Sequence, residues 1–315
     1  MTRDKIAVLS GNAHPALARA MADALGIELC RATVGRFPDG EIDVKVYEDL
    51  RGADVFIVQS TSPPVNDHLI ELLLLLDTCR RASAGRMTAV IPYFGYARKD
   101  RKDEGRVPIS AKLVANMISA AGADRVLTID LHAAQIQGFF DIPVDHLYAK
   151  PVLIEYFRSL GPKSPVIVAP DMGGLKRARA YAESLGAQVA IVDKRRISAD
   201  KVDWEHIIGE VDGKDALIID DMIATGGSMV QAVRIVKEHG ARTVYVGATH
   251  AVFCGDAVHK LAHCGADGIV ITDTVPVHEP LPERFQYRSV APLLARAIKA
   301  IHNSESVSAL FDKIS

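Results

Sequence analysis

Cysteine is scarce in this chain, and its distribution excludes two classes of small domain. Only Cys30, Cys79, Cys254 and Cys264 are present, they lie far apart, and no C-x-x-C pair occurs. Zinc-binding domains and disulfide-stapled domains need cysteines at short, repeated spacings. We therefore expect neither a zinc site nor a disulfide framework, and we expect a protein of a reducing compartment.

Long apolar runs and an excess of one charge are also missing. The richest apolar run, Leu69–Leu76, is too short to cross a bilayer and contains Glu71. Lys and Arg number 37 against 39 acidic residues, so a formal net charge of -2 gives no electrostatic reason to expect a nucleic-acid or membrane partner. Met1–Lys5 leads directly into the strand-like Ile6–Leu9, with no apolar leader between them. We expect a cytoplasmic protein.

Apolar residues are abundant, at 49% of 315 residues, which is enough for more than one buried core. Short β-type runs alternate with helix-compatible segments, which predicts an α/β fold with mainly parallel sheets flanked by helices. The runs are apolar without interruption, as in sheets covered on both faces. The predicted strands are Ile6–Leu9, Val55–Val58, Thr88–Ile91, Val126–Ile129, Val166–Ala169, Val189–Val192, Leu217–Ile219, Val244–Val246 and Ile269–Ile271. The predicted helices include Ala16–Leu25, Asn66–Ala82, Ile109–Ala121, Gly174–Leu185 and Gly227–Glu238.

Prolines interrupt this alternation near the middle of the chain, at Pro143 and Pro151. We place a domain boundary there, which gives domains of residues 1–148 and 149–315 with four or five strands each. Leu127–His132 and Ile218–Asp221 both read as strands that end on acidic residues before a turn and a helix. This similarity suggests that the two domains are duplicates, one of which has lost a glycine-rich loop.

Ala216–Ser228 carries the most information about function. Its apolar residues end on Asp220 and Asp221, a short turn leads to T-G-G-S at Thr225–Ser228, and an apolar-periodic helix follows. In such a turn, glycines let backbone N–H groups approach an oxyanion, and the helix N-terminus supplies partial positive charge. The adjacent carboxylates would repel a phosphate, so sugar hydroxyls, or a cation bound through water, are their expected ligands. The pattern fits ribose 5-phosphate; the alternative is a tight turn between a strand and a helix.

Two loops of the first half hold aromatic and charged side chains together. In Arg36–Glu41, Phe37 is placed to stack on a purine while Asp39 or Glu41 accepts from an exocyclic amine, although Pro-Asp-Gly alone is good turn chemistry. Pro92–Asp103 follows a strand at its carboxyl end, where ligands gather in open α/β sheets. Its cations would neutralise a polyphosphate; the alternative is a solvated charged loop.

Three further residues or pairs follow predicted strands directly. His132 comes after the strand that ends near Asp130, and is a candidate to bind a metal, a water or a phosphate. Asp171 precedes a Gly-Gly helix start and offers the sparse carboxylate support that a nucleotide-borne divalent cation needs. Lys194 and Arg196 follow another strand, either as an exposed patch or as part of an active site. Parallel strands would bring them to the same sheet edge as Asp171, which favours the active site.

Seven segments, in their order and spacing, resemble the ribose-phosphate diphosphokinases, also called phosphoribosyl pyrophosphate (PRPP) synthetases, of the phosphate-activated class. The resemblance covers essentially the whole chain. It rests on F-P-D-G-E at Phe37–Glu41, Q-S-T-S-P-P-V-N at Gln59–Asn66, P-Y-F-G-Y-A-R-K-D-R-K at Pro92–Lys102, D-L-H-A-A-Q-I-Q-G-F-F-D at Asp130–Asp141, P-D-M-G-G at Pro170–Gly174, D-K-R-R at Asp193–Arg196 and the loop Asp220–Ser228. It implies that ATP and ribose 5-phosphate give PRPP and AMP, for nucleotide biosynthesis, with Mg2+ as cofactor.

The resemblance also implies a role for each matching position. Expected ATP contacts are Phe37, Asp39, Gly40, Glu41, Arg98 and Lys99, and expected magnesium positions are His132 and Asp171. Lys194 and Arg196 are expected to start a mobile catalytic loop that closes over the phosphates. Expected ribose 5-phosphate contacts are Arg196, Asp220, Asp221, Ala224, Thr225, Gly226, Gly227 and Ser228.

Fold, assembly and regulation follow from the same resemblance. It implies two phosphoribosyltransferase-like (type I) domains, with the last helix packing back on the N-terminal domain. It further implies a homo-hexamer whose active site is completed across a subunit interface. The segment Ser306, Val307 and Ser308 resembles the family's allosteric segment, where inorganic phosphate activates and ADP inhibits.

Three positions depart from the family pattern. Ala224 stands where the family usually has aspartate, so one polar contact to the sugar is missing. Lys99 replaces a usual glutamine, and Ile197-Ser198 replaces a usual proline-containing start of the catalytic loop. Only the first departure bears on catalysis itself.

Two alternatives remain open on the sequence alone. A phosphoribosyltransferase shares the acid-acid-loop motif, but typically has one such domain and does not need F-P-D-G-E or D-K-R-R. A non-catalytic partner or PRPP-sensing regulator would bind without turnover. Such a protein would be free to lose Lys194 or His132, which are both present.

Ala224→Asp tests the first departure. The restored carboxylate should lower the apparent KM for ribose 5-phosphate by about fivefold, the value of one hydrogen bond of about 1 kcal/mol. Steady-state kinetics with varied sugar phosphate measure it, and the KM for ATP is the internal control. An unchanged or raised KM would mean that the loop compensates elsewhere.

Overall fold

The computed structural model describes residues 5–310 apart from 199 and 200, and it describes only the backbone of residues 194–198, 201–205 and 309. The described chain forms two compact units. Unit 1 runs to Tyr148 and also contains Thr274–Pro276 and the segment that begins at Ser289. Unit 2 contains Ala149–Asp273 and Val277–Arg288.

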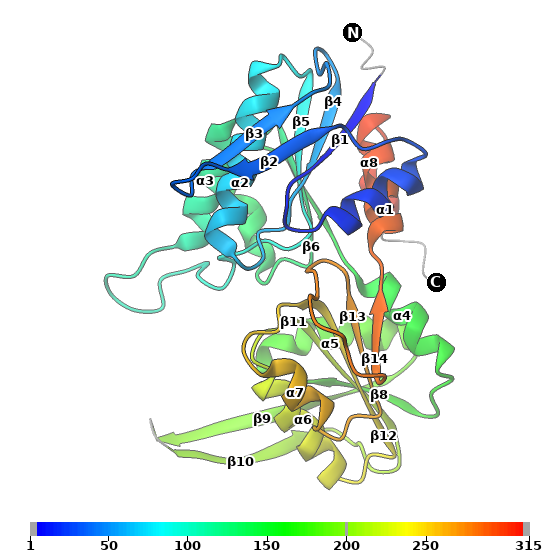
Figure 1. Ribbon diagram of the computed structural model, residues 1–315. Coiled ribbons are helices and arrows are strands. Elements are labelled where there is room, and N and C mark those ends of the chain that lie inside the picture. Colours follow the sequence, from blue (N-terminus) through cyan, green and yellow to red (C-terminus); the bar gives the residue numbers. More distant parts are fainter. Residues whose placement is uncertain (1–4, 199–200, 311–315) are drawn as a thin grey trace. The chain divides into compact units, whose positions relative to one another are not determined.

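Unit 1 is built on a parallel sheet of five strands in the order β1-β4-β5-β6-β7, with helices on its faces (Figure 1). Its strands are short and apolar, and every residue of β4 is buried, as expected for a sheet covered on both sides. The strands are β1 Ile6–Ser10, β4 Asp54–Val58, β5 Arg86–Ile91, β6 Arg125–Ile129 and β7 Val144–Leu147. The helices are α1 Pro15–Leu25, α2 Val65–Arg81, α3 Ser110–Ala121 and α8 Ala291–His302, with 3-10 turns at Ala134–Phe139 and Val307–Leu310.

An antiparallel hairpin stands apart from this sheet. Its strands, β2 Ala32–Arg36 and β3 Ile42–Val46, form a two-stranded sheet of their own that packs on α2. β3 alternates between half-buried and exposed residues, and β2 does so up to Val34, after which Gly35 is also half-buried. The hairpin therefore covers α2 with one face and leaves the other to solvent.

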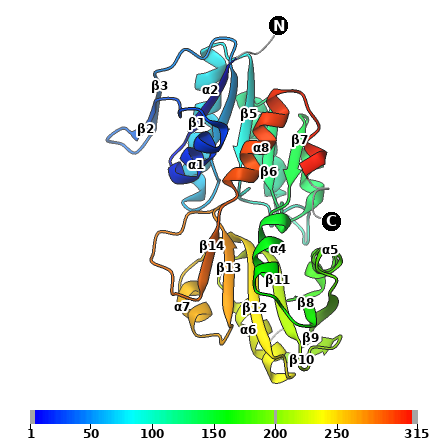
Figure 2. The same cartoon turned by 90° about the vertical axis from the view of Figure 1, so that its right-hand side faces the viewer.

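Unit 2 is built on a seven-stranded sheet in the order β10-β9-β8-β11-β12-β13-β14, and Figure 2 shows β14, β13, β12, β11 and β8 side by side. All neighbours are parallel except β10, which pairs with β9 as an antiparallel hairpin at the sheet edge. The strands are β8 Pro165–Ala169, β9 Gln188–Ser198, β10 Lys201–Ile208, β11 Asp215–Ile223, β12 Thr243–Ala251, β13 Gly268–Thr272 and β14 Phe285–Arg288. The helices are α4 Lys150–Ser159, α5 Leu175–Leu185, α6 Gly227–Glu238 and α7 Ala257–Ala262, with a 3-10 turn at Met172–Gly174.

The two units follow the same chain order. Each begins with one strand, continues with a hairpin and then adds four parallel strands. On this correspondence β1 matches β8, and β4 matches β11. The expected duplication is therefore visible, but its sequence clue was wrong, because Leu127–His132 belongs to β6, which matches β13.

The helix that follows the last strand of each unit belongs to the other unit. α4 follows β7 of unit 1 but packs on α5 in unit 2, whereas α8 follows β14 of unit 2 but packs on α1 in unit 1 (Figure 1). A buried ion-pair network fixes α8 in place. Asp54, which is fully buried at the start of β4, accepts from Arg86 and lies 2.8 Å from Nδ1 of His302. Arg86 also donates to the carbonyl of Ile301.

The predicted α/β class is confirmed, and so are all nine predicted strands and all five predicted helices. The sequence reading missed β2, β3, β7, β10, β14, α4 and α7, and it expected a last helix, α8, only from the family resemblance. It also ended a strand at Val192, whereas β9 continues to Ser198. That extension pairs with β10 at a sheet edge, where a strand needs no apolar run, so hydrophobic periodicity carries no signal for it.

Asp215 anchors the start of β11, and its carboxylate is buried. It accepts from Nε and Nη2 of Arg242 at 2.8 and 2.6 Å, from Oγ1 of Thr243 at 2.7 Å and from the backbone of Lys163 at 2.6 Å. Burial acts to raise the pKa of Asp215, but the hydrogen bonds from Arg242, Thr243 and Lys163 outweigh it and hold the pKa at about 2.

Asp215→Asn should therefore destabilise unit 2 in a pH-dependent way. A pKa lowered from 3.8 to about 2 corresponds to about 2 kcal/mol of stability that is present above pH 4 and lost as the pH falls toward 2. Urea unfolding followed by circular dichroism should show this loss at pH 7 and a smaller one near pH 3. Asp256→Asn, at an exposed pair with Lys260, is the control and should change little. An equal loss at both pH values would contradict the electrostatic account.

Candidate functional site

Asp220 and Asp221 lie near the carboxyl end of β11, within the strand rather than after it. β8 runs parallel to β11 with Val168 opposite Ile218, and β9 runs parallel to β8 with Ile191 opposite Ala169. Asp171, two residues after the end of β8, and Asp220 and Asp221 of β11 all follow the last paired residues of these two strands. The expected convergence of strand ends at one edge is thus present in the backbone of unit 2.

Arg177 of α5 binds both carboxylates. Its Nη1 lies 2.7 Å from Asp220 and its Nη2 lies 3.0 Å from Asp221. The side chain of Asp221 is only 5% exposed, and that of Asp220 is 23% exposed. One cation therefore offsets two adjacent negative charges. The sequence reading missed Arg177, because it is one of three cations in the first five residues of α5 and nothing in the pattern distinguishes it.

The two carboxylates are electrostatically coupled. Burial and the charge of Asp221 raise the pKa of Asp220 well above its usual range, and Arg177 acts against them by lowering it. Asp220 also accepts from the backbone N–H of Asp221 at 2.9 Å, which favours its ionised form. The pair can accept from hydroxyl groups when it is ionised, and its charge depends on Arg177.

The loop after β11 presents an uncapped helix N-terminus. Gly226 precedes α6 with φ of 76°, a left-handed conformation that favours glycine. Among the described contacts no side chain caps α6, and its first turn contains no acidic residue. Thr225, Gly227 and Ser228 are exposed in front of it. The first N–H groups of the helix can therefore bind an anion.

Asp171 and the β9 hairpin border the same edge. Oδ1 of Asp171 accepts from the backbone of Gly174 at 3.1 Å, and the residue is exposed. The backbones of Lys194 and Arg196 lie in β9, with Arg196 opposite Val202 of β10. The side chains of Lys194 and Arg196 are outside the described part of the structure, so their predicted roles remain predictions.

In unit 1 the F-P-D-G-E segment is the tip of the β2–β3 hairpin. The backbone N–H of Phe37 donates to the carbonyl of Glu41, that of Gly40 to Phe37, and that of Glu41 to the carboxylate of Asp39. Gly40 has φ of 96°, which only glycine adopts without strain. The ring of Phe37 is 49% exposed although it is large and apolar. The segment is therefore a tight turn and also presents an exposed aromatic ring. Its interpretation as a turn and its interpretation as a purine-stacking loop are compatible.

Arg98, Lys99 and His132 follow the neighbouring strands β5 and β6 of unit 1. Arg98 and His132 are exposed. Nζ of Lys99 lies 2.9 Å from Asp103, so its charge is already partnered. Gln135 donates to Asp100 at 2.5 Å, which links the two loops. Among the described residues no group of three or more His, Cys, Asp or Glu forms a metal cluster, and no described helix is long and apolar enough to cross a membrane.

Known proteins show close similarity to the whole chain. Residues 6–122 match the model of the N-terminal domain of ribose phosphate pyrophosphokinase, and residues 197–312 match the phosphoribosyl synthetase-associated domain. A ribose-phosphate pyrophosphokinase of Rhodopirellula baltica is 56% identical over 98% of both chains. One of Haemophilus ducreyi is 51% identical over 98% of this chain and 99% of its own. The crystal structure of phosphoribosylpyrophosphate synthetase from Mycobacterium smegmatis has a TM-score of 0.90 at 40% identity, covering 96% of this chain and all of that one.

Arg177→Ala tests the electrostatic coupling of the carboxylate pair. Removing the cation should raise the apparent pKa of the pair by about 1 to 3 pH units, the size of effect that an opposite charge in contact exerts. Carbon NMR of aspartate-labelled protein across a pH series measures it. Arg179→Ala, an exposed arginine on the same helix, is the matched control. If the apparent pKa of the pair is the same in Arg177→Ala as in the wild-type protein, Arg177 does not set the charge of the pair.

Proposed function

Because the chain belongs to the ribose-phosphate pyrophosphokinase family, we propose that its carboxylate pair and glycine loop hold ribose 5-phosphate for diphosphoryl transfer from ATP. The chain is an enzyme of this family and makes PRPP and AMP from those two substrates. What supports the assignment of the site is one arrangement: an uncapped helix N-terminus directly after two carboxylates that Arg177 binds.

The sugar phosphate divides between these two parts by charge. Its phosphate binds the N–H groups of Thr225–Ser228 and the hydroxyls of Thr225 and Ser228, at the positive end of α6. Its ring hydroxyls donate to Asp220 and Asp221, whose negative charge excludes a phosphate from that position. The C1 hydroxyl is then free to attack the β-phosphorus of ATP. A bond forms from the C1 oxygen to the β-phosphorus as the bond from the β-phosphorus to the α–β bridging oxygen breaks. AMP leaves with that oxygen, and the proton of the C1 hydroxyl is released to solvent.

We assign ATP to the tip of the β2–β3 hairpin and to the loop that carries Arg98 and Lys99. We infer that Phe37 stacks on adenine and that Asp39, Gly40 and Glu41 contact it through the hairpin tip. Arg98 would bind the phosphates, since its guanidinium is exposed and matches their geometry. Lys99 would do so only after leaving Asp103. Lys194 and Arg196 are proposed as the catalytic cations that offset charge on the transferred group.

Mg2+ fits the donor set at Asp171. This ion takes oxygen ligands, keeps several waters and needs only one or two carboxylates beside substrate phosphates. Asp171 offers an exposed carboxylate whose Oδ1 is oriented by Gly174. We assign Asp171 to hold the ion in unit 2, and the family resemblance gives His132 of unit 1, which is exposed, as a further magnesium position. When bound, the ion would offset negative charge on the phosphate oxygens of the nucleotide.

Assembly, location and regulation rest on the family resemblance. We propose a cytoplasmic homo-hexamer that inorganic phosphate activates and ADP inhibits, through the segment Ser306–Ser308. In this chain Ser306 and Ser308 are exposed and Val307 begins a 3-10 turn. The exposed hydroxyls are consistent with anion binding.

Phosphorus NMR of the purified protein with Mg2+, ATP, ribose 5-phosphate and inorganic phosphate tests the function. AMP and a diphosphate-bearing sugar should appear in equal amounts. Lys194→Ala should lower turnover by orders of magnitude while ATP binding, measured by calorimetry, persists. Unchanged ATP in the wild-type reaction would instead favour a ligand-binding subunit or a phosphoribosyltransferase.

A further inference from the structure

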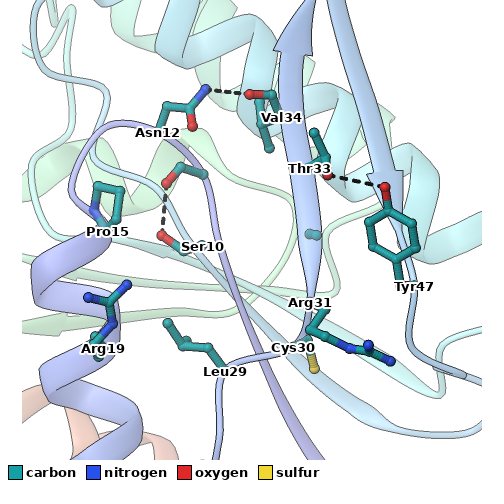
Figure 3. Close-up of a pocket in the computed structure, with 12 residues that line it drawn as sticks. Ser10, Asn12, Pro15, Arg19, Leu29, Cys30, Arg31, Thr33, Val34 and Tyr47 are labelled. Atoms are coloured by element: carbon teal, nitrogen blue, oxygen red, sulfur yellow. Dashed lines mark hydrogen bonds between the residues drawn. The ribbon is translucent and has the colours of Figure 1, made fainter.

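Unit 1 contains a cavity of about 600 Å3 between α1 and the β2–β3 hairpin, but its lining does not form an ion site (Figure 3). Figure 3 shows the guanidinium groups of Arg19 and Arg31 pointing away from each other, and Arg31 already donates to Glu48. α1 begins with Pro15, and the side chain of His14 caps it. The two charged side chains of this lining therefore do not act on one ligand. Two side chains that do lie together, apart from every residue assigned above, are found in unit 2.

α7, which spans Ala257–Ala262, presents a pair of imidazoles. His259 lies within α7 and His263 follows its last residue, so the two stand at positions i and i+4. Residues at this spacing are neighbours on a helix surface, and the centres of the two rings are 4.4 Å apart. Both residues are exposed. This is the spacing at which one face of a helix presents two histidines to a zinc ion.

A hydrogen bond to the backbone sets the tautomer of His263. Its Nδ1 lies 2.8 Å from the carbonyl oxygen of His259. A carbonyl oxygen only accepts, so Nδ1 carries the proton and the neutral ring keeps its lone pair on Nε2. In metal sites a ligating histidine typically donates its other ring N–H to a carbonyl or a carboxylate, which fixes the orientation of the ring. His263 already makes this second contact.

The two rings are close enough to share one ion. A bond from Zn2+ to imidazole is about 2.0–2.1 Å long, so two nitrogens that bind one ion lie at most about 4.2 Å apart. Rings with centres 4.4 Å apart can bring a nitrogen of each within this limit. In the part of the chain that the structure describes, no hydrogen bond uses Nε2 of His259 or of His263.

The neighbouring charges leave the pair accessible to a cation. Lys260 stands between the two histidines in the sequence and is paired with Asp256, with 2.8 Å between Nζ and Oδ1. The hydrogen bond from Lys260 lowers the pKa of Asp256, and the charge of His259 adds to this lowering. A carboxylate therefore lies within electrostatic reach of His259, and the charge of Lys260 is offset.

Imidazole nitrogen selects the class of ion. Zn2+, Ni2+ and Cu2+ bind imidazole well, whereas Mg2+ takes oxygen ligands. The scarcity of cysteine excludes zinc sites built on thiolates and does not bear on a histidine pair. Among the described residues no group of three or more His, Cys, Asp or Glu forms a metal cluster. Water would therefore complete the coordination of an ion held by the two imidazoles.

The inner face of α7 supports the glycine turn. α7 packs beside α6, the helix that follows this turn (Figure 1). Ala257 and Leu261 are fully buried, and a Cβ placed on Gly226 would lie 3.4 Å from Cγ of Leu261 and 3.5 Å from the carbonyl oxygen of Ala257. A helix as short as α7 is unstable by itself, and the two rings meet one ion only while this segment is helical. An ion bound to the pair would therefore stabilise the helix behind the turn.

We propose that His259 and His263 together bind one divalent transition-metal ion, of the class that prefers imidazole, on the exposed face of α7. The site differs in its ligand chemistry from the magnesium position at Asp171. It goes beyond the proposed function and does not depend on it.

Carbethoxylation of histidines by diethyl pyrocarbonate, followed by peptide mass spectrometry, measures the occupancy of each imidazole. The reaction is run on the full chain with increasing Ni2+, without substrates, at about pH 7.5, where an unperturbed imidazole is mainly neutral. Trypsin cleaves after Lys260 and so places His259 and His263 on separate peptides. His239 is the matched reference, because it is exposed and its Nδ1 lies 2.8 Å from the carbonyl oxygen of Ile235, where the pair has a second histidine.

His259 and His263 should be protected together, with a single half-saturating Ni2+ concentration. Ni2+ at about ten times that concentration should slow the labelling of both about tenfold. His259→Gln should raise the Ni2+ concentration that protects His263 by about 100-fold, because two linked ligands bind more tightly than either alone. His263→Gln should do the same to His259, whereas the control His239→Gln should change neither.

Protection of His263 that is unchanged in His259→Gln would overturn the shared site. Protection of the pair at the same Ni2+ concentration as His239 would overturn it too, because it would show two independent surface imidazoles. Equal protection by Mg2+ would overturn the assignment to a transition metal. Each of these outcomes leaves the turnover test of the proposed function unaffected.

Discussion

Two adjacent carboxylates at the end of a buried strand repel each other, and Arg177 is the cation in contact with both that acts against this repulsion. Asp221 is nearly inaccessible, so water does little to screen it. The guanidinium fork contacts one oxygen of each carboxylate, at 2.7 and 3.0 Å. Without it, burial and mutual repulsion would raise the pKa of Asp220 further, and a protonated acid would bind sugar hydroxyls less strongly. The glycine loop before α6 follows these two carboxylates in the chain, so the position of the carboxylates in β11 determines where the loop begins.

The loop tolerates the family departure at Ala224 for a backbone reason. The carbonyl of Ala224 accepts from the N–H of Cys254 at 2.8 Å, and the carbonyl of Ile223 accepts from Val252 at 3.0 Å. These bonds fix the path of the turn whatever side chain stands at 224. Gly226 then completes it with a left-handed conformation. An alanine here therefore leaves the N–H groups of Thr225–Ser228 in place, because these backbone bonds do not involve its side chain.

The central strands and the glycine turn before α6 were predictable because their signals are local. An uninterrupted apolar run and a Gly-Gly helix start are each visible within a dozen residues. The missed elements depend on distant partners. β3 alternates every second residue, but only contact with α2 explains which face is covered. Arg177 becomes informative only once α5 folds against β11. The exchange of α4 and α8 between units depends on tertiary contacts. One such contact joins His302 to Asp54, which lie 248 residues apart in the sequence.

The duplicated fold explains why the matching loops differ. β4 holds in unit 1 the place that β11 holds in unit 2, but the segment after β4 reads Ser62-Pro63-Pro64 where the other reads Thr225-Gly226-Gly227. Proline has no N–H to offer an anion, and the residues before it are occupied. Gln59 binds Ala13 and Glu71, Ser60 donates to the carbonyl of Thr274, and Thr61 donates to Tyr93. In unit 1 this loop therefore serves to join segments of the fold.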